Sequence, residues 1–159
     1  AAGFIVPYFI VSKNIGLLNT VFCLVGPHVS AAIPMSMIII RNNMDSVNDE
    51  MIEAAIIDGC GKGKVFTKMM LPLCKPAIAT ASIFAFMGSW NDYLLPLVML
   101  NKAENMTLTL LPQKFMAYGG GSNMHVIFAC LVMISIPIFV LYCFAQKYMI
   151  SGMTAGTIK

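Results

Sequence analysis

Charged residues are scarce in this sequence of 159 residues. They make up 11% of the chain and apolar residues make up 58%, whereas soluble domains average about 25% charged and about 45–50% apolar residues. So few charges cannot coat a soluble domain of this size, and we expect most of the surface to face lipid or other helices. The net charge is only +3, and the basic residues do not gather beside aromatic ones, which excludes nucleic acid as a partner.

The sequence also has no closely spaced pair of cysteines. The number of cysteines is odd, and the histidines do not stand at the spacing of metal ligands. We therefore predict no disulfide framework, no metal site and no cofactor, and we expect the cysteines to be buried apolar residues. They are Cys23, Cys60, Cys74, Cys130 and Cys143.

The apolar start of the sequence lacks the features of a signal peptide. No basic region precedes residues 1–10, and no small-residue cleavage site follows them. We expect residues 1–12 to be the end of a membrane span whose beginning lies upstream, so that the sequence is the C-terminal fragment of a longer protein.

A phosphate-binding loop is missing as well. The segment 59–64, GCGKGK, resembles one superficially. However, Asp58 stands where the first glycine is required, and Val65 stands where a Ser or Thr is required. We therefore predict that the chain is not an enzyme and has no catalytic residues, and that any ATP is hydrolysed by a partner subunit.

Long uncharged runs dominate the rest of the sequence. Residues 15–40 carry no charge, and a helix over 20–40 would be about 30 Å long, enough to cross a bilayer. Pro27 and Pro34 fall inside this helix, where neighbouring helices can satisfy the freed carbonyls, so we expect kinks rather than an end. Further spans are predicted at 76–100 and 124–146, with a polar external loop over 101–123. The predicted fold class is an all-α polytopic membrane bundle that forms a single domain over 1–159.

Ten charged side chains gather in the segment 41–75, which we therefore place in water. Lysine and arginine mark the cytoplasmic side of membrane proteins. Seven of these residues lie in this segment and in the tail at 147–159, against three in the remaining loops. We predict that the segment and the tail are cytoplasmic and that the chain crosses the inner (plasma) membrane several times.

Apolar residues recur at helical spacing within the charged segment, which predicts a short amphipathic helix. Ser46 is the expected N-cap, with Asp49 at the third helical position. Gly59 is the expected end, because a left-handed residue without a Cβ carries no steric penalty. A second short helix is expected over 62–70, ended by the Leu-Pro pair that follows it. The apolar stripe consists of Met44, Val47, Met51, Ile52, Ala55 and Ile56.

Several segments resemble signatures of one transporter family. The segment 53–59, EAAIIDG, is followed after 11 residues by Leu71-Pro72 and then by KPA at 75–77. This pattern resembles the EAA loop of ABC-importer permeases, above all that of the carbohydrate-importer branch that includes the maltose-type permeases. The fifth-helix, C-terminal and external-turn signatures of that branch are similar to residues 86–93 (FMGSWNDY), 152–156 (GMTAG) and 16–20 (GLLNT).

The resemblance implies that the charged segment forms two coupling helices that fit a groove on a cytoplasmic ATPase. It further implies two ATPase subunits, a second homologous permease subunit, an extracytoplasmic solute-binding protein and a sugar as the solute. An apolar stripe on a helix in water also favours a partner groove. The residues implied to contact the ATPase are Glu53, Ala54, Ala55, Asp58, Gly59, Leu71 and Pro72.

Other interpretations of these features stay open at this point. The loop helix could rest on lipid headgroups instead of entering a protein groove. The protein could also be a secondary transporter, which needs no ATPase, or a membrane scaffold that binds a cytoplasmic partner without transport.

Polar and aromatic residues occur together within the apolar run 76–100. Trp90, Asn91 and Asp92 are candidates for the substrate path, because an ionisable group within a span suggests function and an aromatic face suits a sugar ring. The alternative is that they cap or cross-link helices at a break in the span. No acidic partner for His28 is recognisable in the other spans, so we expect a packing or pore-lining role for it rather than a proton relay.

Overall fold

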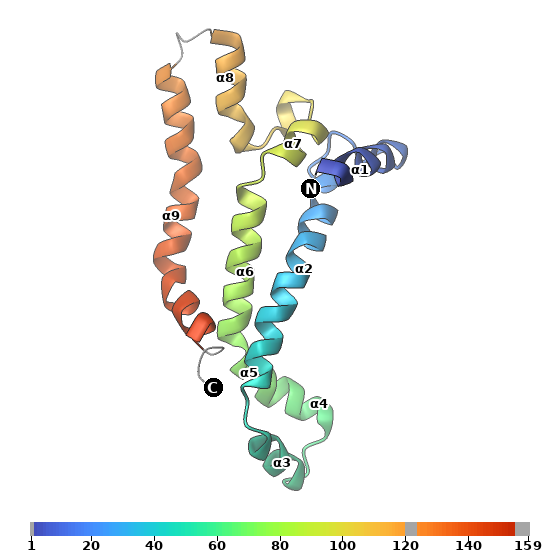
Figure 1. The fold of residues 1–159 in the computed structure, drawn as a ribbon, viewed down its shortest axis with the longest axis vertical. Helices are drawn as coiled ribbons and strands as arrows, with labels where there is room; N and C mark the ends of the chain where they lie inside the picture. Colours follow the sequence, from blue (N-terminus) through green and yellow to red (C-terminus); the bar gives the residue numbers. More distant parts are fainter. Residues whose placement is uncertain (1, 120–123, 155–159) are drawn as a thin grey trace. The chain divides into compact units, whose positions relative to one another are not determined.

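A computed structural model describes residues 2–119 and 124–154, and these residues form helices and turns without any strand (Figure 1). The expected all-α fold is therefore confirmed. The longer helices are α1 (Ala2–Asn14), α2 (Phe22–Asp45), α3 (Asp49–Ile57), α6 (Lys75–Trp90), α8 (Leu111–Gly119) and α9 (Met124–Thr154). The short ones are α4 (Lys62–Val65), the π-helix η1 (Phe66–Met70), α5 (Leu71–Leu73), α7 (Leu94–Met99) and the 3₁₀ turns η2 (Ala103–Asn105) and η3 (Leu108–Leu110).

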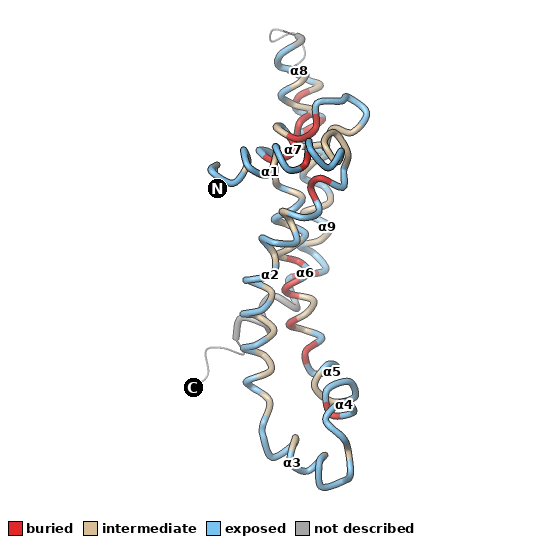
Figure 2. The backbone as a smooth tube through the Cα atoms, turned by 90° about the vertical axis from the view of Figure 1, so that its right-hand side faces the viewer, coloured by how far each residue is buried: buried red, intermediate tan, exposed pale blue. Residues whose placement is uncertain are grey.

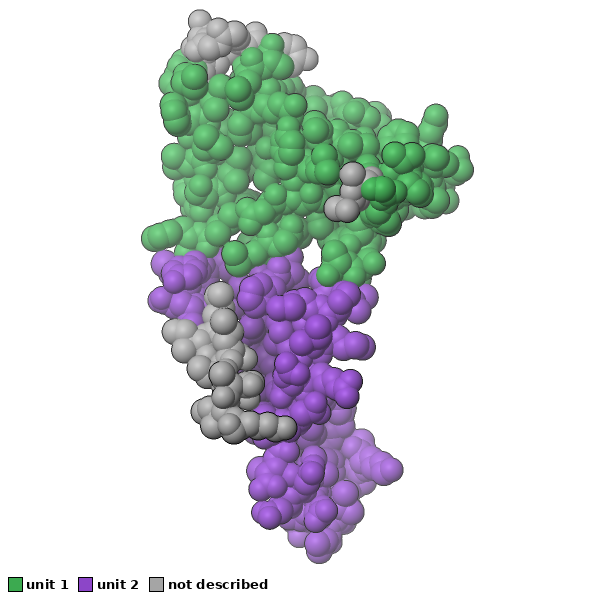
Figure 3. Space-filling model, in the orientation of Figure 1, with its two compact units in different colours: residues 1–31, 86–140 green, residues 32–85, 141–159 purple. Residues whose placement is uncertain are grey.

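The chain divides into two compact units (Figure 3). Unit 1 comprises residues 1–31 and 86–140, and unit 2 comprises residues 32–85 and 141–159. Unit 1 contains α1, α7, η2, η3 and α8, whereas unit 2 contains α3, α4, η1 and α5. Helices α2, α6 and α9 each contribute residues to both units.

Within residues 2–119 and 124–154, two helices are long and apolar enough to cross a membrane, namely α2 and the first part of α9. Helix α2 stays helical through Pro27 and Pro34, as expected, and runs past the predicted end at residue 40. In α9 the apolar part is Met124–Gln146, but the helix continues to Thr154. The predicted tail at 147–159 therefore begins as helix. Residues 155–159, including the end of the segment 152–156, lie outside the described residues.

The predicted span at 76–100 is two helices rather than one. Helix α6 ends at Trp90 and α7 begins at Leu94. The predicted loop at 101–123 also differs from expectation, because it contains η2, η3 and the nine-residue helix α8. Residues 120–123, at the end of the predicted loop, lie outside the described part of the chain.

The core of unit 1 forms where α1 and α7 pack together with the start of α2. The Tyr8 hydroxyl donates to the Cys23 carbonyl at 2.5 Å and satisfies this acceptor among apolar side chains. The buried residues are Cys23, Leu24, Leu95, Met99 and Leu100, and Tyr8, Phe9, Leu17 and Leu18 pack against them.

The first loop helix, α3, lies in unit 2 and has a different cap from the predicted one. The Asn48 side-chain oxygen accepts from the Glu50 N–H at 3.1 Å, so Asn48 is the N-cap and the prediction of Ser46 is wrong. Ser46 instead closes the preceding helix, because its hydroxyl donates to the Asn43 carbonyl at 2.7 Å. Met44, which was expected in the apolar stripe of the loop helix, consequently belongs to α2.

The second loop helix does not end at Leu71 and Pro72, which corrects another prediction. Helix α4 continues into the π-helix η1, where the Leu71 N–H bonds to the Phe66 carbonyl, and then into α5. The wider π turn lies directly before Pro72, which has no N–H to donate to the helix. The break comes at Cys74, after which α6 lies at 64° to the helix Lys62–Leu73. Counted as one, this bent pair would be a third span.

Large apolar side chains are exposed along both long helices (Figure 2). Examples are Phe22 and Met37 on α2, and Phe139 and Phe144 on α9, which are 66–72% exposed. Such surfaces are costly in water, so these faces require lipid or neighbouring helices.

The cysteines follow the prediction only in part. Cys23, Cys74 and Cys130 are buried, as expected. Cys143 is exposed on α9 and Cys60 is half-buried, so the prediction was wrong for these two. Cys143 lies on the outward, apolar surface of its helix, where a small apolar residue suits a lipid-facing position.

The N-cap assignment can be tested by substitution. Replacing Asn48 with Ala should destabilise the start of α3 by about 1 kcal/mol, because the Glu50 N–H loses its acceptor. Amide hydrogen exchange of residues 50–53 should then accelerate about fivefold. Ser46→Ala is the control, and an equal acceleration in that variant would contradict the assignment.

Candidate functional site

Polar side chains stabilise the interruption between α6 and α7. The Asn91 side-chain amide donates to the Met87 carbonyl at 3.0 Å, at the end of α6. Asp92 Oδ1 accepts from the Leu95 N–H at 3.4 Å, at the start of α7. Helix ends leave backbone groups without helical partners, and the Asp92 side chain supplies one to the Leu95 N–H. The Met87 carbonyl also accepts from the Asn91 backbone N–H at 3.1 Å, so the Asn91 side chain adds a second bond to that acceptor.

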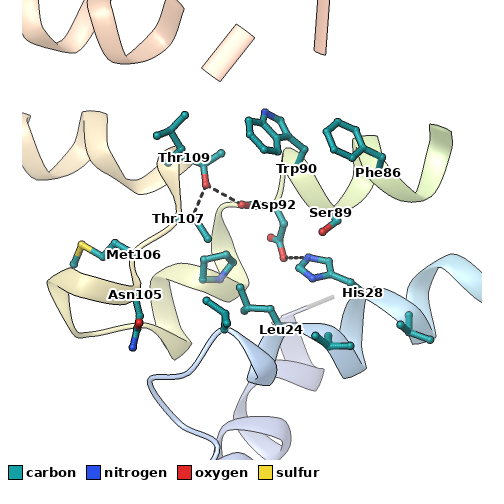
Figure 4. A pocket seen from close by; sticks show the side chains of 15 residues that line it. Leu24, His28, Phe86, Ser89, Trp90, Asp92, Asn105, Met106, Thr107 and Thr109 are labelled. Carbon is teal, nitrogen blue, oxygen red and sulfur yellow. Dashed lines mark hydrogen bonds and ion pairs between the residues drawn. The ribbon is translucent and has the colours of Figure 1, made fainter. Parts of the chain in front are cut away.

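A pocket of about 590 Å³ lies beside this interruption in unit 1 (Figure 4). Its walls come from α2, from the end of α6, from α7 and from the segment 105–109. The volume lies within the range of roughly 300–1,000 Å³ that is typical of small-molecule sites. Most of the lining is apolar, and its polar side chains are His28, Ser89, Asp92, Asn105, Thr107 and Thr109.

A hydrogen-bonded pair of side chains joins α2 to the interruption at the pocket wall. His28 Nε2 lies 3.0 Å from Asp92 Oδ2, and the two side chains are 19% and 24% exposed. The expectation that His28 has no acidic partner is therefore wrong. The pair joins residues 64 positions apart in the sequence and fixes the Asp92 carboxylate at the pocket surface.

Aromatic rings form another wall of the same pocket. Phe86 and Trp90 stack with ring centroids 5.5 Å apart and an interplanar angle of 16°. The Trp90 indole N–H donates to the Ile134 carbonyl of α9 at 3.1 Å. Of the three candidate path residues, Trp90 and Asp92 line the pocket, whereas Asn91 is not among the lining residues and serves the helix end.

Threonine hydroxyls connect the segment 105–109 to the interruption. Thr109 Oγ1 donates to the Asp92 carbonyl at 3.1 Å and lies 3.0 Å from Thr107 Oγ1. The backbone and the side chain of Asp92 are thus held from opposite sides, by Thr109 and by His28.

The predicted ATPase-contact residues lie in unit 2. Five of them lie on α3 or directly after it, whereas Leu71 and Pro72 belong to α5. No side chain of α3 is buried, and its Met51, Ile56 and Ile57 are 50%, 51% and 85% exposed. The apolar side chains of this helix therefore lack full cover within the described chain. Of the seven predicted residues, Glu53, Ala54, Asp58, Gly59, Leu71 and Pro72 are exposed and Ala55 is half-buried.

Gly59 ends α3 in the left-handed conformation that the sequence predicted. Its φ is +81°, and its N–H bonds to the Ile56 carbonyl at 3.0 Å. The N–H of Cys60 bonds to the Ala55 carbonyl at 3.0 Å, which completes a Schellman motif. A Cβ added at Gly59 would meet nothing within 4 Å, so the backbone angle, rather than space, requires glycine here.

The described residues offer no group of three or more His, Cys, Asp or Glu that could hold a metal ion. The pocket instead combines a flat aromatic wall with hydroxyl, carboxylate and imidazole groups. Such a surface can stack against a ring and exchange hydrogen bonds with a polar solute.

Comparison with known families decides the assignment. Residues 2–154 match the family described as binding-protein-dependent transport system inner membrane component. The chain belongs to this family.

Several permeases of this family are similar to the chain. A putative ABC transporter permease protein of Caldicellulosiruptor sp. is 35% identical over 155 residues, which cover 98% of this chain and 56% of the relative. A diacetylchitobiose uptake system permease protein of Streptomyces coelicolor is 33% identical, with 98% and 52% covered. A maltodextrin transport system permease protein of Bacillus subtilis is 33% identical, with 96% and 55% covered. The chain thus spans about half the length of these permeases.

The pairing of His28 with Asp92 was not predicted from the sequence. Each residue is the only Asp, Glu, Lys, Arg or His of its apolar stretch, 15–40 or 76–100. This shared property could have indicated the pair, because two polar groups in apolar surroundings are stabilised when they form a hydrogen bond with each other.

A double-mutant cycle tests the His28–Asp92 hydrogen bond. His28→Ala and Asp92→Ala should show a coupling energy of about 1 kcal/mol, because a typical intramolecular hydrogen bond contributes roughly that much. The measurement is the denaturation midpoint of the purified protein in detergent. Asn91→Ala is the control partner, since its side chain bonds to its own helix. Additive effects of His28→Ala and Asp92→Ala would contradict the pairing.

Proposed function

We propose that this chain is the translocating part of the permease subunit of an ATP-driven importer for sugars. The observation that carries the proposal is the exposed apolar helix α3, ended by a left-handed glycine, in a chain of the inner-membrane permease family. In this proposal the permease moves solute, and a separate subunit hydrolyses ATP.

The loop 44–72 is proposed to couple the two activities. A helix with Met51, Ile56 and Ile57 exposed gains stability when a protein groove covers these side chains. Glu53, exposed on the same helix, can add a charge-assisted hydrogen bond, and the small Ala54 permits close approach. Movement of the ATPase is then passed through this loop to α6 and shifts the permease between inward-open and outward-open states.

The family description supports a wider assembly around this chain. A binding-protein-dependent system has a solute-binding protein, which we place on the extracytoplasmic side. We further propose two ATPase subunits and a second homologous permease subunit. The excess of lysine and arginine in the loop and the tail supports a cytoplasmic location for both.

A sugar is the proposed solute. Similar permeases carry the names of maltodextrin, diacetylchitobiose and arabinooligosaccharide transport systems. The stacked Phe86 and Trp90 rings, with Asp92 and Thr107 nearby in the pocket, suit a ring that bears hydroxyl groups. Trp90 and Asp92 are therefore proposed to line the substrate path, and Asn91 is proposed to act structurally.

Gly59→Val tests the coupling role. Valine at φ +81° is strained by at least about 1–2 kcal/mol, so the turn after α3 should change shape while membrane insertion is retained. In proteoliposomes that contain the assembled transporter, stimulation of ATP hydrolysis by the loaded binding protein should be lost.

Gly61→Val is the matched control for that experiment. Gly61 has φ −67° and open space around its Cβ position, so valine fits there without backbone strain. Full stimulation in Gly59→Val would contradict the coupling role, whereas a loss in both variants would mean that the backbone angle at Gly59 is not the cause.

Asp92→Ala and Asp92→Asn separate the path role from a purely structural one. The asparagine can still accept a hydrogen bond from His28, whereas the alanine cannot. If Asp92 contacts solute, Asp92→Ala should raise the KM for uptake about tenfold or more and alter the ranking of maltotriose, diacetylchitobiose and arabinotriose. An unchanged ranking, with only less folded protein in the membrane, would assign Asp92 to structure alone.

A further inference from the structure

Asn19 occupies the turn between α1 and α2 in an unusual backbone conformation. Its φ is +64°, and it alone among the non-glycine residues of the described chain has a positive φ. Asparagine tolerates this left-handed region better than most residues, but the conformation persists only where surrounding contacts hold it. The contacts at Asn19 therefore identify what the turn is built to hold.

Three polar groups of Asn19 bind one distant loop. Its N–H donates to the Met99 carbonyl at 3.1 Å, and its side-chain oxygen accepts from the Asn101 N–H at 2.6 Å. Its carbonyl accepts from the Asn105 side-chain amide at 2.5 Å. These partners lie 80 or more positions along the chain and fix the loop from the end of α7 to η2 at both of its ends.

The fixed loop leads directly into the pocket wall. Asn105, Met106 and Thr107 line the pocket, and Thr109 bonds to the Asp92 carbonyl at 3.1 Å. The segment 105–109 is thus attached at one end to Asn19 and at the other end to Asp92.

A closed circuit of contacts results within unit 1. Asp92 pairs with His28, and His28 belongs to α2, which begins three residues after Asn19. The backbone of α2 and the hydrogen bonds of Asn19 and Asp92 therefore link the lining residues His28, Asp92 and Asn105 to one another. If one link is removed, the segment 105–109 loses its fixed distance from the aromatic wall.

We propose that Asn19 is a positioning residue that holds the segment 105–109 against the pocket and thereby sets the affinity for solute. The effect on solute rests on the proposed function, whereas the effect on the segment does not. Asn19 does not line the pocket, so it acts through Asn101 and Asn105 rather than by contact with solute.

The first experiment is amide hydrogen exchange on the full transporter complex without solute. In Asn19→Gly, which keeps the left-handed turn but removes the side-chain acceptor, exchange over residues 101–110 should accelerate roughly two- to tenfold, the equivalent of one neutral hydrogen bond. Asn19→Asp keeps an acceptor oxygen for the Asn101 N–H and should stay close to the wild type. The exposed Asn14→Ala, in the last turn of α1, is the matched control. Exchange in Asn19→Gly equal to that of the wild type would overturn the proposal.

The second experiment measures uptake of maltotriose, diacetylchitobiose and arabinotriose into proteoliposomes. Asn19→Gly should raise the KM for the preferred sugar roughly two- to tenfold with little change in Vmax, and Asn19→Asp should restore it. A fall in Vmax at constant KM would contradict a positioning role. Wild-type protein that takes up none of the three sugars would count against the sugar proposal, and the exchange experiment would still decide the role of Asn19.

Discussion

Backbone groups at a helix end need hydrogen-bond partners, and in apolar surroundings they cannot take them from water. The chain has to meet this need where α6 stops at Trp90, within an otherwise apolar run. Asp92 provides a partner for the Leu95 N–H from its side chain, Thr109 binds the Asp92 carbonyl from a distant segment, and Asn91 adds a second bond to the Met87 carbonyl. The hydrogen bonds at the helix interruption bring polar side chains together there. Two of these side chains, Asp92 and Thr109, also line the neighbouring pocket.

The loop between α2 and α6 meets the same need in a different way. The Asn48 side chain accepts a hydrogen bond from the first turn of α3, and the Schellman motif around Gly59 donates hydrogen bonds to carbonyls of its last turn. These backbone groups therefore find partners within the loop itself. Its apolar side chains are then left available for another molecule. Self-sufficient helix ends and an uncovered face are what a docking helix requires.

Local signals allowed much of this arrangement to be predicted from the sequence. Long runs without charged residues predicted α2 and α9. The position of Gly59 predicted the end of α3, where the structure shows a φ of +81°. The cap at Asn48 was missed because two cap residues lie close together, and only the extent of α2 decides between them. The His28–Asp92 pair depends on how separate helices meet in three dimensions, which local periodicity does not specify. The π turn before Pro72 likewise results from a choice between hydrogen-bond partners one residue apart.

The indole of Trp90 stacks on Phe86, bonds to Ile134 through its N–H and lines the pocket. Trp90 is also the single tryptophan of this sequence. Fluorescence excited at the red edge of the indole band therefore originates from the pocket wall alone when the isolated chain is illuminated. The molecule carries its own optical reporter at the site where a solute ring would stack, so occupancy can be followed without attaching a dye.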